Sequence, residues 1–93
     1  MDDDITQLVN KIITEQELVI GPLAWNEATK VSGLRVDVKT HHVDLYGDPK
    51  EVLGRLVSQY ERLFGLASRE VCRDAVRPLI AQIPEDQLPS VLR

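Results

Sequence analysis

The side chains most suited to chemistry gather in one short segment near the middle of the chain. His41 and His42 are adjacent, and Asp37 and Asp44 flank them. Neighbouring residues on a strand point to opposite faces, so the two histidines could share a metal ion only in a distorted turn. His42, Asp37 and Asp44 would instead share one exposed face of a hairpin. They are the better metal candidates, because carboxylates and imidazole are ordinary metal ligands.

An ordinary charged surface is the alternative to a metal site, and the sequence favours it. Arg35 and Lys39 flank Asp37 and can neutralise the acidic pair without a metal. The chain contains no Gly-rich phosphate loop, no nucleophile elbow and no paired-histidine zinc motif. We therefore predict no bound metal, no cofactor and no catalytic residue, and we expect that the protein is not an enzyme.

The single cysteine, Cys72, lies within an apolar helical stripe. A cysteine there usually behaves as a small buried hydrophobe. Arg69 and Arg73 would lower its pKa only if it were exposed, and no histidine is placed to act as its base. We therefore predict that Cys72 belongs to the core. A lone cysteine also excludes an internal disulfide, which fits a reducing cytoplasm.

The most suggestive polar pattern consists of four arginines on two successive helices: Arg62, Arg69, Arg73 and Arg77. The last three recur every four residues and so share one helix face, which could bind an anion or a phosphate group. Glu70 and Asp74 interleave with them, however, and can pair with the last two arginines at i+3. The sequence therefore favours a solvated face of ion pairs.

Apolar side chains outside the main stripes give a second candidate surface. Trp25 lies at the edge of its predicted helix, where it either covers the rim of the core or anchors a partner. The sequence favours the rim. Leu88, Val91 and Leu92 lie in the tail, where they pack against the body of the protein or against a partner.

The helix predicted over residues 48–64 organises the rest of the chain. Asp48 can cap its first turn, and Glu51 completes a capping box. Apolar residues then recur at helical spacing until Gly65, which offers the left-handed backbone that ends a helix.

Other helical segments are expected at about residues 4–20, 22–32 and 68–82, with a short C-terminal turn over 84–92. We expect Ser68 to cap the fourth helix and Pro78 to kink or break it. Residues 4–20 and 48–64 also match as an internal repeat. Gly21 aligns with Gly65, and Val19 aligns with Leu63 on the apolar stripe, which predicts two equivalent helices with equivalent ends.

Period-two alternation predicts a β-hairpin over about residues 34–46. Placing both apolar sets on one face favours a register that pairs Val38 with Val43, with Thr40 and His41 in the turn. The predicted fold is therefore mainly α (α+β). Two αα-hairpins form a small four-helix arrangement, joined by a short antiparallel β-hairpin that lies across one end.

Composition limits the functional classes. A chain of 93 residues with 43% apolar content predicts one domain, 1–93, with a small aliphatic core. The net charge of −4 opposes dedicated nucleic-acid binding, because neutralising phosphates requires a positive surface.

No apolar run is long enough for a membrane span, and the acidic start differs from a signal or transit peptide. The expected location is the cytoplasm.

From His42 onward, the expected elements are a strand, a helix and a second helix, which opens with Ser68-Arg69 and continues with Arg73 and Ala75. This pattern resembles the ribbon-helix-helix DNA-binding family and covers under half of the chain. The resemblance implies a dimer whose paired strands enter the major groove, with outward residues such as His42 reading bases. Asp44 departs from the family pattern, because an aspartate opposes phosphate.

The sequence therefore leaves two hypotheses for the function. The first is a small non-catalytic interaction or regulatory module that binds another protein, or itself as a homodimer, through a helical surface. The second is a DNA-binding transcriptional regulator with a ribbon-helix-helix-like C-terminal half, and the acidic charge makes it the weaker of the two.

Overall fold

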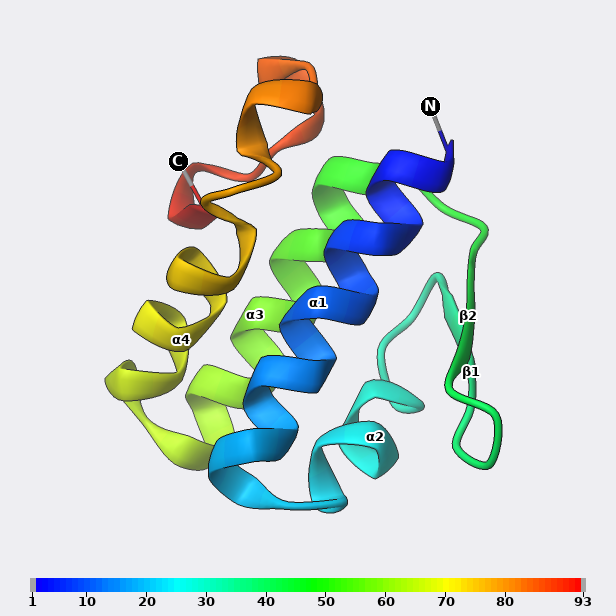
Figure 1. The fold of residues 1–93 in the computed structure, drawn as a ribbon, viewed down its shortest axis with the longest axis vertical. Coiled ribbons are helices and arrows are strands. Elements are labelled where there is room, and N and C mark those ends of the chain that lie inside the picture. The colour runs from blue at the N-terminus through cyan, green and yellow to red at the C-terminus, as the bar shows by residue number, and fades with distance from the viewer. Residues whose placement is uncertain (1, 93) are drawn as a thin grey trace.

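A computed structural model describes residues 2–92 of the chain. Within this range the helices are α1 (Asp2–Ile20), α2 (Leu23–Ala28), α3 (Pro49–Phe64) and α4 (Leu66–Val76). Strands β1 (Leu34–Asp37) and β2 (His42–Leu45) form an antiparallel hairpin between the two helical pairs. Three short 3-10 turns, Ile80–Gln82, Glu85–Gln87 and Ser90–Leu92, complete the tail (Figure 1). The predicted mainly α fold with two helical hairpins and a β-hairpin is confirmed.

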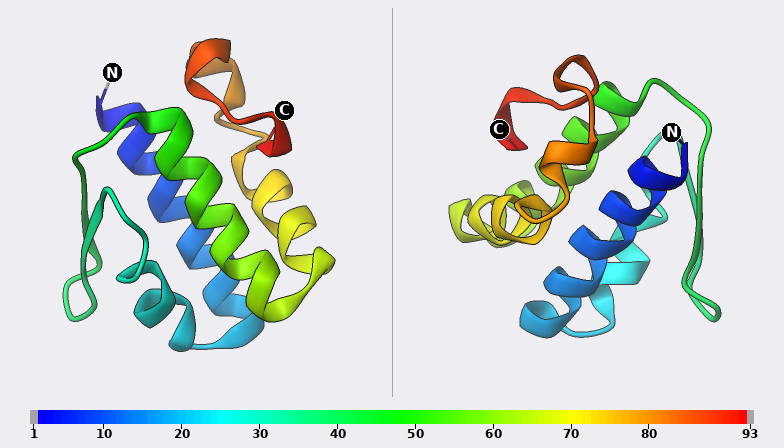
Figure 2. Two further views of the ribbon diagram at one scale, coloured as in Figure 1. Left: turned by 180° about the vertical axis from the view of Figure 1, so that it is seen from behind. Right: turned by 45° about the horizontal axis from the view of Figure 1, so that its top comes forward.

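The four helices enclose an aliphatic core. Helix α1 packs against α2 and α4, and α3 also packs against α2 and α4. The hairpin lies along the side of α1 and α2 rather than across one end of the bundle as predicted (Figures 1 and 2). Its inward face carries Leu34 and Val43, both buried in the common core. That face can lose its contact with water only against the long side of the helices.

Helix α3 forms as its sequence predicts. The Asp48 side chain caps it by accepting a hydrogen bond of 3.1 Å from the backbone N–H of Glu51. Its apolar stripe is buried up to Tyr60, whose ring is fully enclosed. The stripe of α1 is buried in the same way from Ile5 to Ile13. The two helices therefore supply ten of the 22 buried apolar side chains found within residues 2–92, as expected for amphipathic helices that are unstable alone.

The two halves of the predicted repeat end alike. Gly21 and Gly65 both have positive φ angles, of 77° and 89°, and each donates its N–H over 2.8 Å to the carbonyl four residues before it. The predicted stripe is wrong in its last turn, because Val19 and Leu63 are both exposed. The next residues, Ile20 and Phe64, still pack against the core, so each last turn buries only part of its predicted stripe.

Three predicted boundaries need correction. Helix α2 ends at Ala28, short of residue 32, and the chain continues in turns with i+3 hydrogen bonds to the start of β1. Helix α4 starts at Leu66, so Ser68 is buried inside it and does not cap it. The same helix ends at Val76, where Pro78 breaks it as predicted, since proline has no N–H and clashes with the preceding turn.

The predicted hairpin register is wrong by two residues. Val36, not Val38, pairs with Val43, and Asp37 therefore faces His42. One oxygen of Asp37, Oδ1, accepts the N–H groups of Lys39 at 2.9 Å and Thr40 at 3.3 Å, which builds a longer loop over residues 38–41. Both registers keep the same apolar face, and the two hydrogen bonds that Asp37 accepts favour the observed one.

Candidate interaction surfaces

The proposed metal ligands meet on the outer face of the hairpin, but they are already engaged with one another and with the backbone. His42 Nε2 lies 3.2 Å from Asp44 Oδ1, and Asp37 is held in the turn. The backbone N–H of Lys39, followed by that of Thr40, lowers the pKa of Asp37. Across residues 2–92, no three His, Cys, Asp or Glu side chains are placed to hold a metal ion.

The other histidine takes part in anchoring the hairpin. The His41 ring stacks on the Trp25 ring with centroids 3.8 Å apart and an interplanar angle of 8°. The His41 carbonyl also accepts a hydrogen bond of 3.2 Å from Asn10 Nδ2 of α1. His41 adopts φ 60°, and these contacts help to hold that conformation. The hairpin loop is therefore fastened to both α1 and α2.

Cys72 is buried in the core, as the sequence predicts. The side-chain amide of Gln16, which is also fully buried, donates to Cys72 Sγ at 3.2 Å and to the Ser68 carbonyl at 2.9 Å. Burial raises the pKa of the Cys72 thiol to about 11. The group therefore stays protonated at neutral pH and is a poor nucleophile.

The arginine face of α4 is compensated by neighbouring acids. Arg69 lies 2.8 Å from Glu61 of α3. The two expected i+3 pairs are present, Arg73 with Glu70 at 3.8 Å and Arg77 with Asp74 at 3.1 Å. An anion approaching this face would meet as many carboxylates as guanidinium groups. This arrangement matches the solvated face of ion pairs that the sequence favours.

The predicted apolar strip is largely inaccessible. Trp25 is only 3% exposed, and Leu88 and Leu92 are buried as well, while Val91 is half-buried. The tail folds back so that Ser90–Leu92 contacts α4. Apart from Val91, these side chains close the core and are not available to a partner.

A different apolar surface, not predicted from the sequence, lies where both helical pairs turn. Five large side chains are exposed there, and we call them the apolar end: Leu18, Val19, Leu23, Leu63 and Leu66. Leu18 is 78% exposed, and Val19 and Leu66 are each 65% exposed. Figures 1 and 2 show the α1–α2 and α3–α4 junctions at the same end of the bundle. The Gln16–Ser68 hydrogen bond fixes the last turns of α1 beside the first turn of α4.

The sequence contained one signal for this surface. Leu18 is apolar but falls outside the helical stripe of α1, which leaves it without a core position. The gathering of the five residues could not be predicted, because it depends on how the two helical pairs pack.

A groove lies on the solvent side of α3, and we call it the basic groove. This basic groove has a volume of about 600 Å³ and runs between α3, the loop after α2 and the tail. Lys30, Arg55 and Arg62 line it, with Glu51 as its acidic member. Two residues of the predicted interaction set, Arg62 and Val91, therefore meet in this groove.

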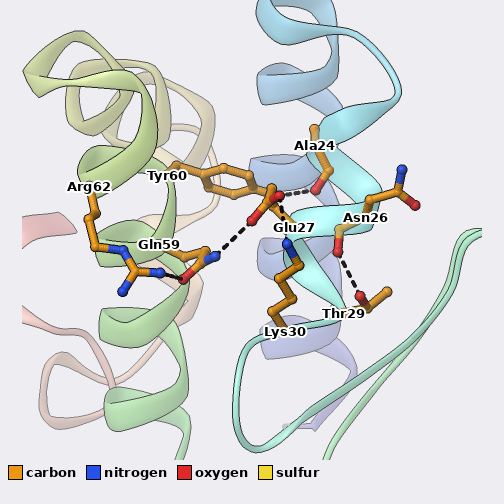
Figure 3. Close-up of polar contacts among 8 residues, drawn as sticks. All are labelled: Ala24, Asn26, Glu27, Thr29, Lys30, Gln59, Tyr60 and Arg62. Carbon is orange, nitrogen blue, oxygen red and sulfur yellow. Dashed lines mark hydrogen bonds and ion pairs between the residues drawn. The ribbon is translucent and has the colours of Figure 1, made fainter.

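A chain of hydrogen bonds organises one wall of the basic groove (Figure 3). Glu27 accepts from Lys30 Nζ at 3.1 Å and from Gln59 Nε2 at 2.8 Å. The other atom of that amide, Gln59 Oε1, accepts from Arg62 Nη2 at 2.9 Å. The hydrogen bond from Gln59, and then the one from Lys30, lower the pKa of Glu27, which therefore stays ionised and fixes the orientation of the amide.

No protein-family model, curated protein or solved structure matches this chain. The ribbon-helix-helix resemblance therefore depends on its short motif alone. In a dimer of that family the strand pairs with a strand of the partner, whereas β2 pairs here with β1 of the same chain. Within residues 2–92, no helix is long and apolar enough to cross a membrane.

Proposed function

We propose that this protein is a non-catalytic interaction module that binds another protein chain through the apolar end. The observation that carries the proposal is the exposure of five large apolar side chains, drawn from the ends of α1 and α3 and the starts of α2 and α4. Such side chains are usually scattered singly on a monomer, and their grouping marks a docking surface. The partner that can be tested directly is a second copy.

The rest of the molecule supports this proposal. The core is closed by Trp25 and the C-terminal tail, so the exposed leucines are not the edge of an unfinished interior. The one cysteine is a buried, protonated thiol, which opposes nucleophilic catalysis. A symmetric contact between two copies would bring the same apolar side chains of each copy together and remove them from water.

The experiment is light scattering behind a sizing column over a range of protein concentrations. We expect the wild type to self-associate and a Leu18→Ser, Leu66→Ser variant to remain monomeric. A symmetric contact loses four leucine side chains in that variant, enough to weaken association by about 100-fold or more. Val38→Ser is the matched control, because Val38 is also exposed but lies on the hairpin.

Two outcomes would count against this function. If the wild type stays monomeric at every concentration, a second copy of the chain is excluded as the partner. Equal binding of an apolar fluorescent dye by the wild type and the double-serine variant would show that the apolar end offers no accessible surface, and would refute the proposal as a whole.

A further inference from the structure

The basic groove has a construction that the apolar end does not explain. Its floor consists of Gly54 and Ser58, which are small, and its walls carry the cationic heads of Lys30, Arg55 and Arg62. None of the α3 members belongs to the buried stripe of that helix. The tail packs against Gly54, since a Cβ atom there would lie in ordinary van der Waals contact, at 3.7 Å, with Pro89 Cβ. The groove is therefore shaped by three separate parts of the chain.

The two arginines are held in position without being fully neutralised. Arg62 donates to the neutral Gln59 amide, and it has no carboxylate at ion-pair distance within residues 2–92. Arg55 donates over 3.3 Å to the Ser32 carbonyl and makes only a long, exposed contact of 3.6 Å with Glu51. Both guanidinium groups therefore keep N–H donors for an incoming anion.

The spacing of these arginines selects the shape of the ligand. They are seven residues apart on one helix, which separates their Cα atoms by about 10 Å along the axis. Their guanidinium groups are held by different partners, Arg55 by the Ser32 carbonyl and Arg62 by Gln59 Oε1, so we expect an extended anion to suit the pair better than a single phosphate. In an extended polyproline II segment, side chains three residues apart lie on one side about 9 Å from each other. Two carboxylates at that spacing match the two arginines.

We propose that the basic groove binds an extended acidic peptide segment of a partner protein, with carboxylates three residues apart on Arg55 and Arg62. Lys30 lies in the same lining but is paired with Glu27 at 3.1 Å, so the two arginines carry the proposal. Pro89 and Val91 offer an apolar edge to the peptide backbone.

The test uses fluorescence anisotropy with the full chain and a labelled peptide, Glu-Pro-Pro-Glu-Pro-Pro-Glu. The prolines hold the peptide extended and so reduce the entropy lost on binding. We expect Arg55→Gln with Arg62→Gln to weaken binding by about tenfold or more, since each loses a charge-assisted hydrogen bond. The control is Arg35→Gln with Arg77→Gln, which makes the same change in net charge outside the groove and should alter the affinity less than threefold.

A variant that should bind the peptide more tightly provides a second test. Glu51→Gln removes the acidic member of the groove lining and frees Arg55, so it should tighten peptide binding. Circular dichroism checks that each variant is folded. No binding at millimolar protein, an equal loss in both arginine double variants, or equal affinity for a peptide with its glutamates two residues apart would overturn the proposal. Inorganic tripolyphosphate binding as tightly as the peptide would overturn it as well.

Discussion

Replacing Tyr60 by phenylalanine tests the link between the two helical pairs. Tyr60 is 0% exposed, and its hydroxyl donates a hydrogen bond of 2.6 Å to the Ala24 carbonyl of α2 (Figure 3). Phenylalanine keeps the ring and leaves no sizeable cavity. The Tyr60→Phe change therefore isolates one buried hydrogen bond between α3 and α2.

The expected cost follows from that isolation. A buried hydrogen bond contributes about 1 kcal/mol net, and a carbonyl left with a missing partner adds a desolvation cost of similar size. We therefore expect the free energy of unfolding to fall by about 2 kcal/mol. For a domain of this size, each 1 kcal/mol lowers the melting temperature by about 4–8 °C, so the total shift is about 8–16 °C.

The assay is thermal and urea unfolding followed by circular dichroism, with Tyr46→Phe as the matched control. Tyr46 is 66% exposed, so its substitution should change the free energy of unfolding by less than about 0.5 kcal/mol. A Tyr60→Phe protein as stable as the Tyr46→Phe protein would refute the reasoning, because it would show that the 2.6 Å contact contributes nothing.

Alkaline titration gives an independent reading of the same group. Burial raises the pKa of Tyr60 above its ordinary value. The stability that this confers is fully present below the unfolded pKa of about 10 and is lost as the pH rises beyond it. Ultraviolet titration should therefore show Tyr60 ionising only as the protein unfolds.

The remaining predictions concern a glycine and the cysteine. Gly33 has φ 91°, and a Cβ atom there would lie 2.6 Å from Val52 Cγ2, so Gly33→Ala should lower the free energy of unfolding by about 3 kcal/mol. Gly21→Ala, at φ 77° with nothing within 4 Å, should cost only about 1 kcal/mol in the same urea titration, and equal costs would contradict the close approach at Gly33. The Cys72 thiol should react with a disulfide reagent only under unfolding conditions. Burial raises the pKa of this thiol to about 11, so the stability that the protonated thiol contributes should persist below about pH 9. That contribution should disappear as the pH rises from about 9 to about 11, and the Cys72→Ala variant should not show this loss. Rapid labelling of the native protein would contradict the buried position.

The sequence by itself determined the features that depend on neighbouring residues. The capped start of α3, the glycine ends of α1 and α3, and the break near Pro78 each follow from backbone rules that act within a few residues. The helical and period-two patterns likewise determined the order of elements and the buried position of Cys72.

The candidate surfaces were decided only by the tertiary structure. Local rules cannot tell which residue of a predicted stripe meets a neighbouring element, so Val19 was expected inside and lies outside, while Ile20 packs against the core. Nor could they predict that the tail would cover the core with Leu88 while leaving Val91 beside Arg62 in the basic groove. The physical reason is the same in both cases. Burial and the meeting of side chains depend on contacts between segments distant in sequence, and these form only when the helices and the tail pack together.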